Sequence, residues 1–207
     1  EIPYMLLITA VLLVMGMTGN EITFIEGVIL WILFIAYLLY LYFLAKKGND
    51  SGDEQSVKLY PVWKCLLFIV LGGVCVVIGS QLVVNGATTI ARACGMSERF
   101  IGLTIVAFGT SLPELVTSVS AARKGNAGIA IGNIVGSNIF NILFVIGTVA
   151  LICPVPFESR FVIDTVVAIL CGVLLWGGTI RHKELRKPCG VVMLLCYAAY
   201  FVYLAAM

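Results

Sequence analysis

The chain is built from long apolar stretches that are separated by short polar breaks. Most stretches hold about 20 residues, the length that a helix needs to cross a hydrocarbon core about 30 Å thick. The breaks contain Gly, Asn, Pro and charged residues, which are typical of turns and helix ends. The stretches lie at about 3–17, 25–45, 62–91, 99–123, 127–152, 160–180 and 188–206. This pattern predicts about seven transmembrane helices.

The composition agrees with a membrane protein and excludes a soluble domain. Apolar residues make up 61% of the chain and charged residues 12%, with a mean hydropathy of +1.08. An ordinary soluble domain has roughly 45–50% apolar and 25% charged residues. We therefore expect an all-α integral membrane protein. The net charge is only +2 and no basic run alternates with aromatic residues, which argues against a nucleic-acid partner.

One polar stretch is long enough to act as a linker. Residues 46–60 are rich in Lys, Gly, Asp and Ser, a composition that is typical of flexible connections. We expect this linker to separate the two helices within residues 1–45 from a larger part at residues 61–207.

The basic residues indicate how the chain crosses the membrane. If seven helices alternate in direction, successive loops lie on opposite sides, and most Lys and Arg residues fall on one of them. That side holds Lys46, Lys47, Lys58, Lys64, Arg123, Lys124, Arg181, Lys183, Arg186 and Lys187. The other side holds Arg92, Arg99 and Arg160. Because basic loops stay in the cytoplasm, we expect residues 46–60 and 181–187 to be cytoplasmic and the C-terminus to be outside.

A single acidic residue, Glu114, lies near the middle of a predicted transmembrane helix. The chain has 11 Asp and Glu residues, and all the others fall in loops or close to helix ends. A charge at the centre of a membrane helix costs about 2.5–3.5 kcal/mol on insertion scales, so such a residue is usually retained for function. The alternative is a protonated Glu114 that only hydrogen-bonds a neighbouring helix.

Glu114 follows a proline that should interrupt its helix. Pro113 has no N–H to donate to the carbonyl of Gly109, and it disfavours helical geometry at Leu112. A broken helix at membrane depth is tolerated where its backbone lines a cavity. The face that carries Glu114 also carries, at helical spacing, residues 104, 107, 110, 111, 117 and 118. The alternative is an ordinary proline kink whose polar groups pair internally.

The next predicted helix carries a second polar stripe. Asn133, Ser137 and Asn141 are spaced by four residues and therefore share one face. The short connection at residues 124–126 makes this helix antiparallel to the Glu114 helix, so the two polar stripes can meet near the middle of the membrane. Asn side chains can instead form hydrogen bonds between helices, which is the alternative for Asn133 and Asn138.

Together these residues form a set of hard oxygen donors. The set comprises one carboxylate, the hydroxyls of two Ser and one Thr, an amide oxygen and the carbonyls that the helix break releases. Such donors suit Ca²⁺ or Na⁺ and not zinc or copper. An anion would need Lys or Arg, and neither occurs in these stripes. The donors therefore predict a site for a hard cation.

The two motifs together resemble a known family. Residues 104–114 end in G-T-S-x-P-E, and residues 132–141 read G-N-x-x-G-S-N-x-x-N. This pair resembles the alpha-repeat signature of the calcium/cation antiporter superfamily, specifically its prokaryotic Na⁺/Ca²⁺ exchanger branch. The resemblance extends over about residues 59–207. It implies a ten-helix fold of two inverted repeats with broken helices at mid-membrane, in the cell (inner) membrane of a prokaryote.

The resemblance also implies a set of ion ligands. They are Glu114, Thr110, Ser111, Ala107, Ser137 and Asn141. Glu114 would bind both Ca²⁺ and Na⁺, and Ala107 would contribute its backbone carbonyl. Some family members have Asp in place of Asn141, which leaves the ion stoichiometry and any role of K⁺ or H⁺ open. No cofactor is implied, because the ions are the substrates.

The signature occurs once here, whereas the family has two copies. The chain then corresponds to the C-terminal two-thirds of an exchanger: residues 1–45 complete the preceding half, 46–60 are the linker, and 61–207 form the second repeat with its motif at about 99–152. Ca²⁺ takes six to eight oxygens, and a single carboxylate here faces its two charges. We therefore expect a second carboxylate in the missing N-terminal repeat. The start at Glu1 instead of Met also suggests that a preceding part has been removed.

The expected function is secondary active exchange of Ca²⁺ for Na⁺ by alternating access. A Ca²⁺/H⁺ antiporter is one alternative, because Glu114 could titrate instead of binding Na⁺. An inactive fragment or assembly subunit that lacks the first repeat is another. An intramembrane protease would need two aspartates or a Ser–His pair at membrane depth, and the only His is His182 in a basic loop. We therefore expect a transporter and not an enzyme, with Ca²⁺, Na⁺ and the lipid bilayer as its partners.

Overall fold

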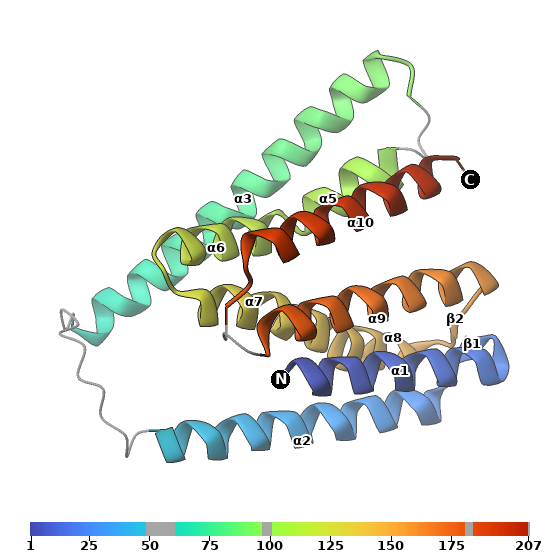
Figure 1. Ribbon diagram of the computed structural model, residues 1–207, viewed down its shortest axis with the longest axis horizontal. Helices are drawn as coiled ribbons and strands as arrows, with labels where there is room; N and C mark the ends of the chain where they lie inside the picture. The colour runs from blue at the N-terminus through green and yellow to red at the C-terminus, as the bar shows by residue number, and fades with distance from the viewer. Residues whose placement is uncertain (49–60, 97–100, 181–183, 207) are drawn as a thin grey trace. The chain divides into compact units, whose positions relative to one another are not determined.

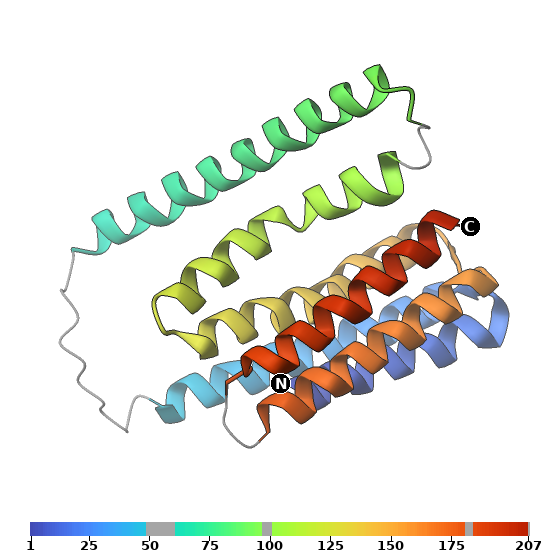
Figure 2. The ribbon, with the colours of Figure 1, turned by 45° about the horizontal axis from the view of Figure 1, so that its top comes forward.

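The computed structural model describes two compact units of the chain (Figures 1 and 2). The described residues are 1–48, 61–96, 101–180 and 184–206. Unit 1 holds the described residues of 1–53 and 127–197, and unit 2 holds those of 54–126 and 198–207. Most of the predicted linker and part of the predicted 181–187 loop lie outside the described residues.

The described residues are almost entirely helical. Among them, five helices are long and apolar enough to cross a membrane: Ile2–Gly19, Phe24–Lys47, Val62–Ala93, Ala127–Ile152 and Phe161–Thr179. The predicted span at 99–123 is a broken helix whose described part begins at Ile101. The predicted span at 188–206 forms a helix at Lys187–Ala206. The predicted all-α membrane architecture is therefore confirmed.

Unit 1 is a bundle of helices that are apolar on nearly all sides. Its elements are α1 (Ile2–Gly19), α2 (Phe24–Gly48), α7 (Ala127–Phe140), the π-helix η2 (Asn141–Ile146), α8 (Gly147–Ile152), α9 (Ser159–Thr179) and the first part of α10 (Lys187–Ala206). The most deeply buried side chains of its helices are those of Ile8, Leu30, Val135, Ile139 and Leu143, so the core lies among α1, α2, α7 and η2. Because lipid is as apolar as these side chains, helix association depends on close fit and not on a hydrophobic face.

A two-residue sheet ties the turn after α1 to the turn after α8. Strand β1 (Glu21–Ile22) pairs antiparallel with β2 (Val155–Pro156), with Ile22 opposite Val155. Asn20 precedes β1 in a left-handed conformation (φ 56°), and its carbonyl accepts a 2.7 Å hydrogen bond from the backbone N–H of Phe157. The ring of Phe157 occupies the space that a side chain at Gly16 would need. These contacts fix the ends of α1 and α2 against α8 and α9.

The backbones of α2 and α8 approach closely at two glycines. A Cβ at Gly27 would lie 3.0 Å from the carbonyl oxygen of Gly147 and 2.9 Å from Cβ of Ala150. A Cβ at Gly147 would lie 3.2 Å from Cβ of Leu30 and 3.3 Å from Cδ1 of Trp31. Small residues of this kind let membrane helices pack closely and gain van der Waals contact. The two glycines therefore set the spacing between α2 and α8.

Unit 2 contains one long helix alongside one broken helix (Figure 2). Its main elements are α3 (Val62–Ala93), the π-helix η1 (Gly102–Val106), α5 (Ala107–Thr110) and α6 (Leu112–Arg123). With 32 residues, α3 is about 48 Å long at 1.5 Å per residue. It contacts η1, α5 and α6, and the side chain of Val84 occupies the space that a Cβ at Gly109 would need. The absence of a side chain at Gly109 thus allows α3 to pack directly onto α5.

Helices α3 and α6 end in the same way, at a glycine with positive φ. Gly95 after α3 has φ 78° and Gly125 after α6 has φ 77°. After α6, the N–H of Asn126 donates to the carbonyl of Ala121 over 2.9 Å, and an equivalent bond closes α3. This arrangement is the Schellman motif, which satisfies carbonyls at a helix end and favours Gly because a Cβ is strained there. Both glycines lie in breaks that the sequence pattern predicts.

We predict that Gly27→Ala destabilises the protein, because the added methyl group overlaps atoms of α8. Overpacking costs about 1–3 kcal/mol, more than the gain of up to about 1 kcal/mol in helix propensity. The midpoint of thermal unfolding of the full native gene product in detergent should therefore fall. Gly177→Ala is the matched control, since nothing in the described structure lies within 4 Å of a Cβ there. Equal midpoints for the two variants would contradict the close contact.

Candidate functional site

The broken helix of unit 2 is interrupted at Ser111. Helix α5 ends at Thr110, Ser111 has φ −94° and ψ 2°, and α6 begins at Leu112 with Pro113 in its first turn. The predicted break is therefore present. The sequence placed the distortion at Leu112, but Leu112 is helical and the distortion lies one residue earlier. The physical reason is that proline fits the first turn of a helix, where its missing N–H removes no intrahelical bond.

Hydrogen bonding around the break differs from that of a continuous helix. The N–H of Ser111, which would reach the carbonyl of Ala107 in an α-helix, donates to the carbonyl of Phe108 over 3.1 Å. Pro113 has no N–H to donate to the carbonyl of Gly109. The last turn of a helix directs its carbonyl oxygens beyond the helix end. The end of α5, which includes the carbonyl of Ala107, is therefore a place of partial negative charge.

Glu114 lies in the first turn of α6, directly after the break. The N-terminus of a helix carries partial positive charge, which stabilises a carboxylate at this position. The side chain of Glu114 is half-buried, and its Oε2 atom is fully buried. Thr110 and Ser111, which separate the two half-helices, are exposed. The break thus groups one carboxylate, two hydroxyl side chains and the carbonyl end of α5 within residues 107–114.

The second polar stripe lies in unit 1, on α7 and η2. Asn133 and Ser137 are half-buried on α7, and Asn141 is the exposed first residue of η2. The amide of Asn138 donates to the carbonyl of Ile134 in its own helix over 2.9 Å. The structure therefore places Ser137 and Asn141 one turn apart along the chain. It places the other predicted ligands, Ala107, Thr110, Ser111 and Glu114, in unit 2.

Both motif helices contain a π-helical segment that sequence reasoning did not predict. Segment η1 precedes α5, and η2 follows α7 directly after Phe140. A π-helix has hydrogen bonds between residues five apart, is rare, and often occurs at functional sites. No composition or spacing rule identifies such a segment, because its residues are ordinary helix residues. The contacts that hold η2 become visible only in the folded unit.

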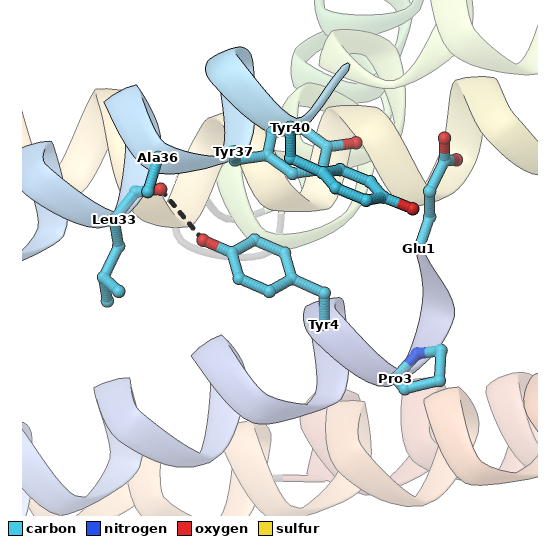
Figure 3. Close-up of a pocket in the computed structure, with 7 residues that line it drawn as sticks. All are labelled: Glu1, Pro3, Tyr4, Leu33, Ala36, Tyr37 and Tyr40. Carbon is cyan, nitrogen blue, oxygen red and sulfur yellow. Dashed lines mark hydrogen bonds between the residues drawn. The ribbon is translucent and has the colours of Figure 1, made fainter. Parts of the chain in front are cut away.

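A separate pocket lies between the start of α1 and the middle of α2 (Figure 3). Its described lining consists of Glu1, Pro3, Tyr4, Leu33, Ala36, Tyr37 and Tyr40. The rings of Tyr4 and Tyr37 are stacked with centroids 5.2 Å apart, and the Tyr4 hydroxyl donates to the carbonyl of Leu33 over 2.9 Å. This lining is mainly aromatic and aliphatic, and among the described residues it includes none of the predicted ion ligands.

Comparison with known proteins identifies relatives over nearly the whole chain. The sequence profile of the family described as "Sodium/calcium exchanger protein" matches residues 64–206. The chain is 34% identical to a putative antiporter, CaxA, of Alkalimonas amylolytica over 97% of this chain and 66% of that protein. It is 38% identical to the sodium/calcium exchanger MaX1 of Methanosarcina acetivorans over 68% of this chain and 41% of that protein.

A solved structure shows the same fold. The sodium/calcium exchanger from Methanococcus jannaschii superposes with a TM-score of 0.78 at 31% identity, over 97% of this chain and 63% of that one. The chain thus spans less than two thirds of the length of these relatives. At this identity and coverage, the resemblance that the two sequence motifs indicated is confirmed, and the chain belongs to the sodium/calcium exchanger protein family.

Proposed function

We propose that the whole protein exchanges Ca²⁺ for Na⁺ across the membrane by alternating access, and that this chain carries the second half of the ion site. The observation that carries the proposal is the helix break at Ser111, which brings a carboxylate directly after the carbonyl end of α5. Non-helical backbone at membrane depth is tolerated where it lines a cavity. A carboxylate and carbonyl oxygens at such a break suit a dehydrated hard cation.

We propose six residues as ion ligands. They are Ala107, Thr110, Ser111, Glu114, Ser137 and Asn141. Glu114 supplies the negative charge, and the hydroxyls, the amide and the carbonyl of Ala107 supply neutral oxygens. Only residues 124–126 connect α6 to α7 along the chain. This short connection supports the proposal that both motif helices serve one site.

This chain alone supplies too little negative charge for Ca²⁺. Ca²⁺ takes six to eight oxygens, and Glu114 balances one of its two charges. The relatives are longer than this chain. We therefore propose that an N-terminal repeat completes the site with a second carboxylate. In this arrangement residues 1–45 complete the preceding half, 46–60 connect the halves, and 61–207 form the second repeat.

Coupling follows if Ca²⁺ and Na⁺ compete for the same oxygens. Either ion can then stabilise the state that exposes the site to one side of the membrane, but both cannot occupy the site together. Hydroxyl and carbonyl oxygens beside Glu114 support Na⁺ as the counter-ion, because a proton would need only the carboxylate. Ca²⁺/H⁺ exchange is the alternative, since a carboxylate can also carry a proton. The second alternative is an inactive fragment or assembly subunit that lacks the first repeat.

We predict that Glu114→Gln abolishes Na⁺-driven Ca²⁺ uptake, because it removes the charge but keeps the size of the side chain. The measurement is uptake of radioactive Ca²⁺ into proteoliposomes that hold the full native gene product, with an outward Na⁺ gradient or, in parallel, an outward H⁺ gradient. Flux in the Glu114→Gln variant should fall to that of protein-free vesicles.

Glu21→Gln is the matched control for this experiment. Glu21 is an exposed glutamate in β1, so its substitution should leave the flux unchanged. Size-exclusion elution and the unfolding midpoint establish that each variant is folded. Full Na⁺-driven flux in folded Glu114→Gln protein would reject the ligand assignment. Uptake driven only by the H⁺ gradient would support the antiporter alternative.

We also propose an orientation in the cell membrane, from the excess of Lys and Arg on one side. The linker at residues 46–60 and the loop at 181–187 are cytoplasmic, and the C-terminus is outside. The turn between α8 and α9, which includes Cys153, is then on the outer side. Cys153 is exposed and directly follows the last residue of α8.

We predict opposite labelling of two single cysteines by a maleimide that cannot cross the membrane. In a variant that retains only Cys153, intact cells should be labelled. In a cysteine-free background with Ser51→Cys, labelling should require permeabilised cells, because residue 51 lies in the linker. The reverse pattern would invert the proposed topology.

A further inference from the structure

We propose that Trp31 and Thr148 are positioning residues for the ion site, because together they hold η2, the π-helical segment that begins at Asn141. Neither side chain contacts the ion in this proposal, and both act through the backbone of η2. The inference rests on the proposed function, in which Asn141 is an ion ligand. All the contacts that carry it lie within unit 1.

A chain of two hydrogen bonds links α2 to the backbone of η2. The indole Nε1–H of Trp31 donates to Thr148 Oγ1 over 3.2 Å. The hydroxyl of Thr148 in turn donates to the carbonyl of Phe144 over 2.6 Å. A hydroxyl has one hydrogen and can also accept, so Thr148 satisfies both partners at once. The carbonyl of Phe144 lies within η2, which ends two residues later at Ile146.

Aromatic contacts hold the same segment against α2. The ring centroid of Phe144 lies 5.1 Å from that of Trp31 and 5.4 Å from that of Phe34. Phe140, the residue before Asn141, stacks on Phe144 at 4.7 Å and meets Phe34 edge-on at 6.0 Å. Such pairs contribute about 0.5–1.5 kcal/mol beyond their buried area. The aromatic residues therefore attach both the start and the middle of η2 to α2.

The glycine contact between α2 and α8 anchors the far end of η2. Gly147 is the first residue after η2, and a Cβ there would meet both Leu30 and Trp31. Cδ1 of Trp31 thus packs against Gly147, and the adjacent Nε1–H bonds Thr148. The fully buried side chain of Leu143 fixes η2 in the core of unit 1. These contacts leave η2 little freedom to change its winding.

The winding of η2 decides how Ser137 and Asn141 are oriented relative to α8. In a π-helix the hydrogen bonds join residues five apart, so the segment holds one more residue than a regular α-helix would. Removing that residue from the turn would rotate the side chains before η2 by about 100° relative to those after it, given 3.6 residues per turn. Asn141 lies at this boundary. A support that preserves the π turn therefore preserves the direction of the proposed ligands.

The chain provides a matched control for the Thr148 bond. Thr165 in α9 donates its hydroxyl to the carbonyl of Phe161 over 2.6 Å, the same bond to the fourth preceding residue. Thr165 lies in a regular α-helix and not beside a π-helical segment. Replacing either threonine by valine keeps the shape and removes the hydroxyl. Only the Thr148 change should alter the ion site.

The experiment compares the kinetics of Na⁺-driven Ca²⁺ uptake by variants of the full native gene product in proteoliposomes. Trp31→Phe removes the N–H but keeps an aromatic ring, Thr148→Val removes the hydroxyl, and Thr148→Ser retains it. We expect Trp31→Phe and Thr148→Val to raise KM for Ca²⁺ by about threefold to tenfold, with a maximal rate within about twofold of the unmodified protein. Thr148→Ser and Thr165→Val should keep the original KM. The double variant should not exceed Thr148→Val, because both changes break one chain of bonds.

An unchanged KM in Trp31→Phe and Thr148→Val would overturn the positioning role. A lower maximal rate and a lower yield of folded protein at constant KM would also overturn it, because that result is expected of residues that only pack. If the unmodified protein itself shows no Na⁺-driven uptake, the proposed function fails and the positioning role fails with it. If the unmodified protein shows Na⁺-driven uptake and the variants have the same KM as it does, only the positioning role fails.

Discussion

The backbone of a membrane protein must satisfy its own hydrogen bonds, because the bilayer core offers no water to replace them. Pro113 has no N–H, so it cannot donate to the carbonyl of Gly109 as a residue in a continuous helix would. The chain responds with a one-residue turn, in which the N–H of Ser111 donates to the carbonyl of Phe108. The turn leaves the carbonyl end of α5 beside the N-terminus of α6, where Glu114 lies. The interruption therefore groups carbonyl oxygens and a carboxylate, which supports the proposed cation site.

The same absence of water changes how the helices pack. Apolar side chains gain little by leaving lipid, so close backbone contact and specific side-chain fit replace the hydrophobic core of a soluble protein. In unit 1 the backbones of Gly27 and Gly147 meet, and in unit 2 Val84 fills the space beside Gly109. In unit 1 these contacts also fix α8, which follows the π-helical segment η2. Packing and site geometry are thus parts of one arrangement.

The chain belongs to a family whose matched members are longer than it is. The family is shown by the profile match over residues 64–206 and by the superposition with an exchanger of known structure. The chain spans 63% of that structure, and its motifs supply one carboxylate. Ca²⁺ carries two positive charges, and Glu114 would balance one of them in the proposed site. The proposed N-terminal repeat would supply the second carboxylate.

The sequence by itself determined the features that depend on composition and covalent chemistry. Apolar length predicted the helices, and Pro113 predicted the break within one residue. The polar breaks predicted where α3 and α6 end, and the structure places Gly95 and Gly125 there with positive φ. The two polar motifs predicted the family because their order and spacing are specific. The ligand roles of the six motif residues stay a prediction.

Only the tertiary structure decided how unit 1 holds its second motif helix. The change from α7 to η2 occurs at Asn141, where η2 packs against α2. Trp31 on α2 is separated from its partner Thr148 by 117 residues. Local sequence carries no signal for such a pairing, since Trp, Phe and Thr occur throughout apolar helices. The two-residue sheet between distant turns is likewise invisible to pattern analysis, because it is too short to alternate. Local chemistry fixed where the helices start, stop and break, whereas long-range packing decided how they wind and which faces they present.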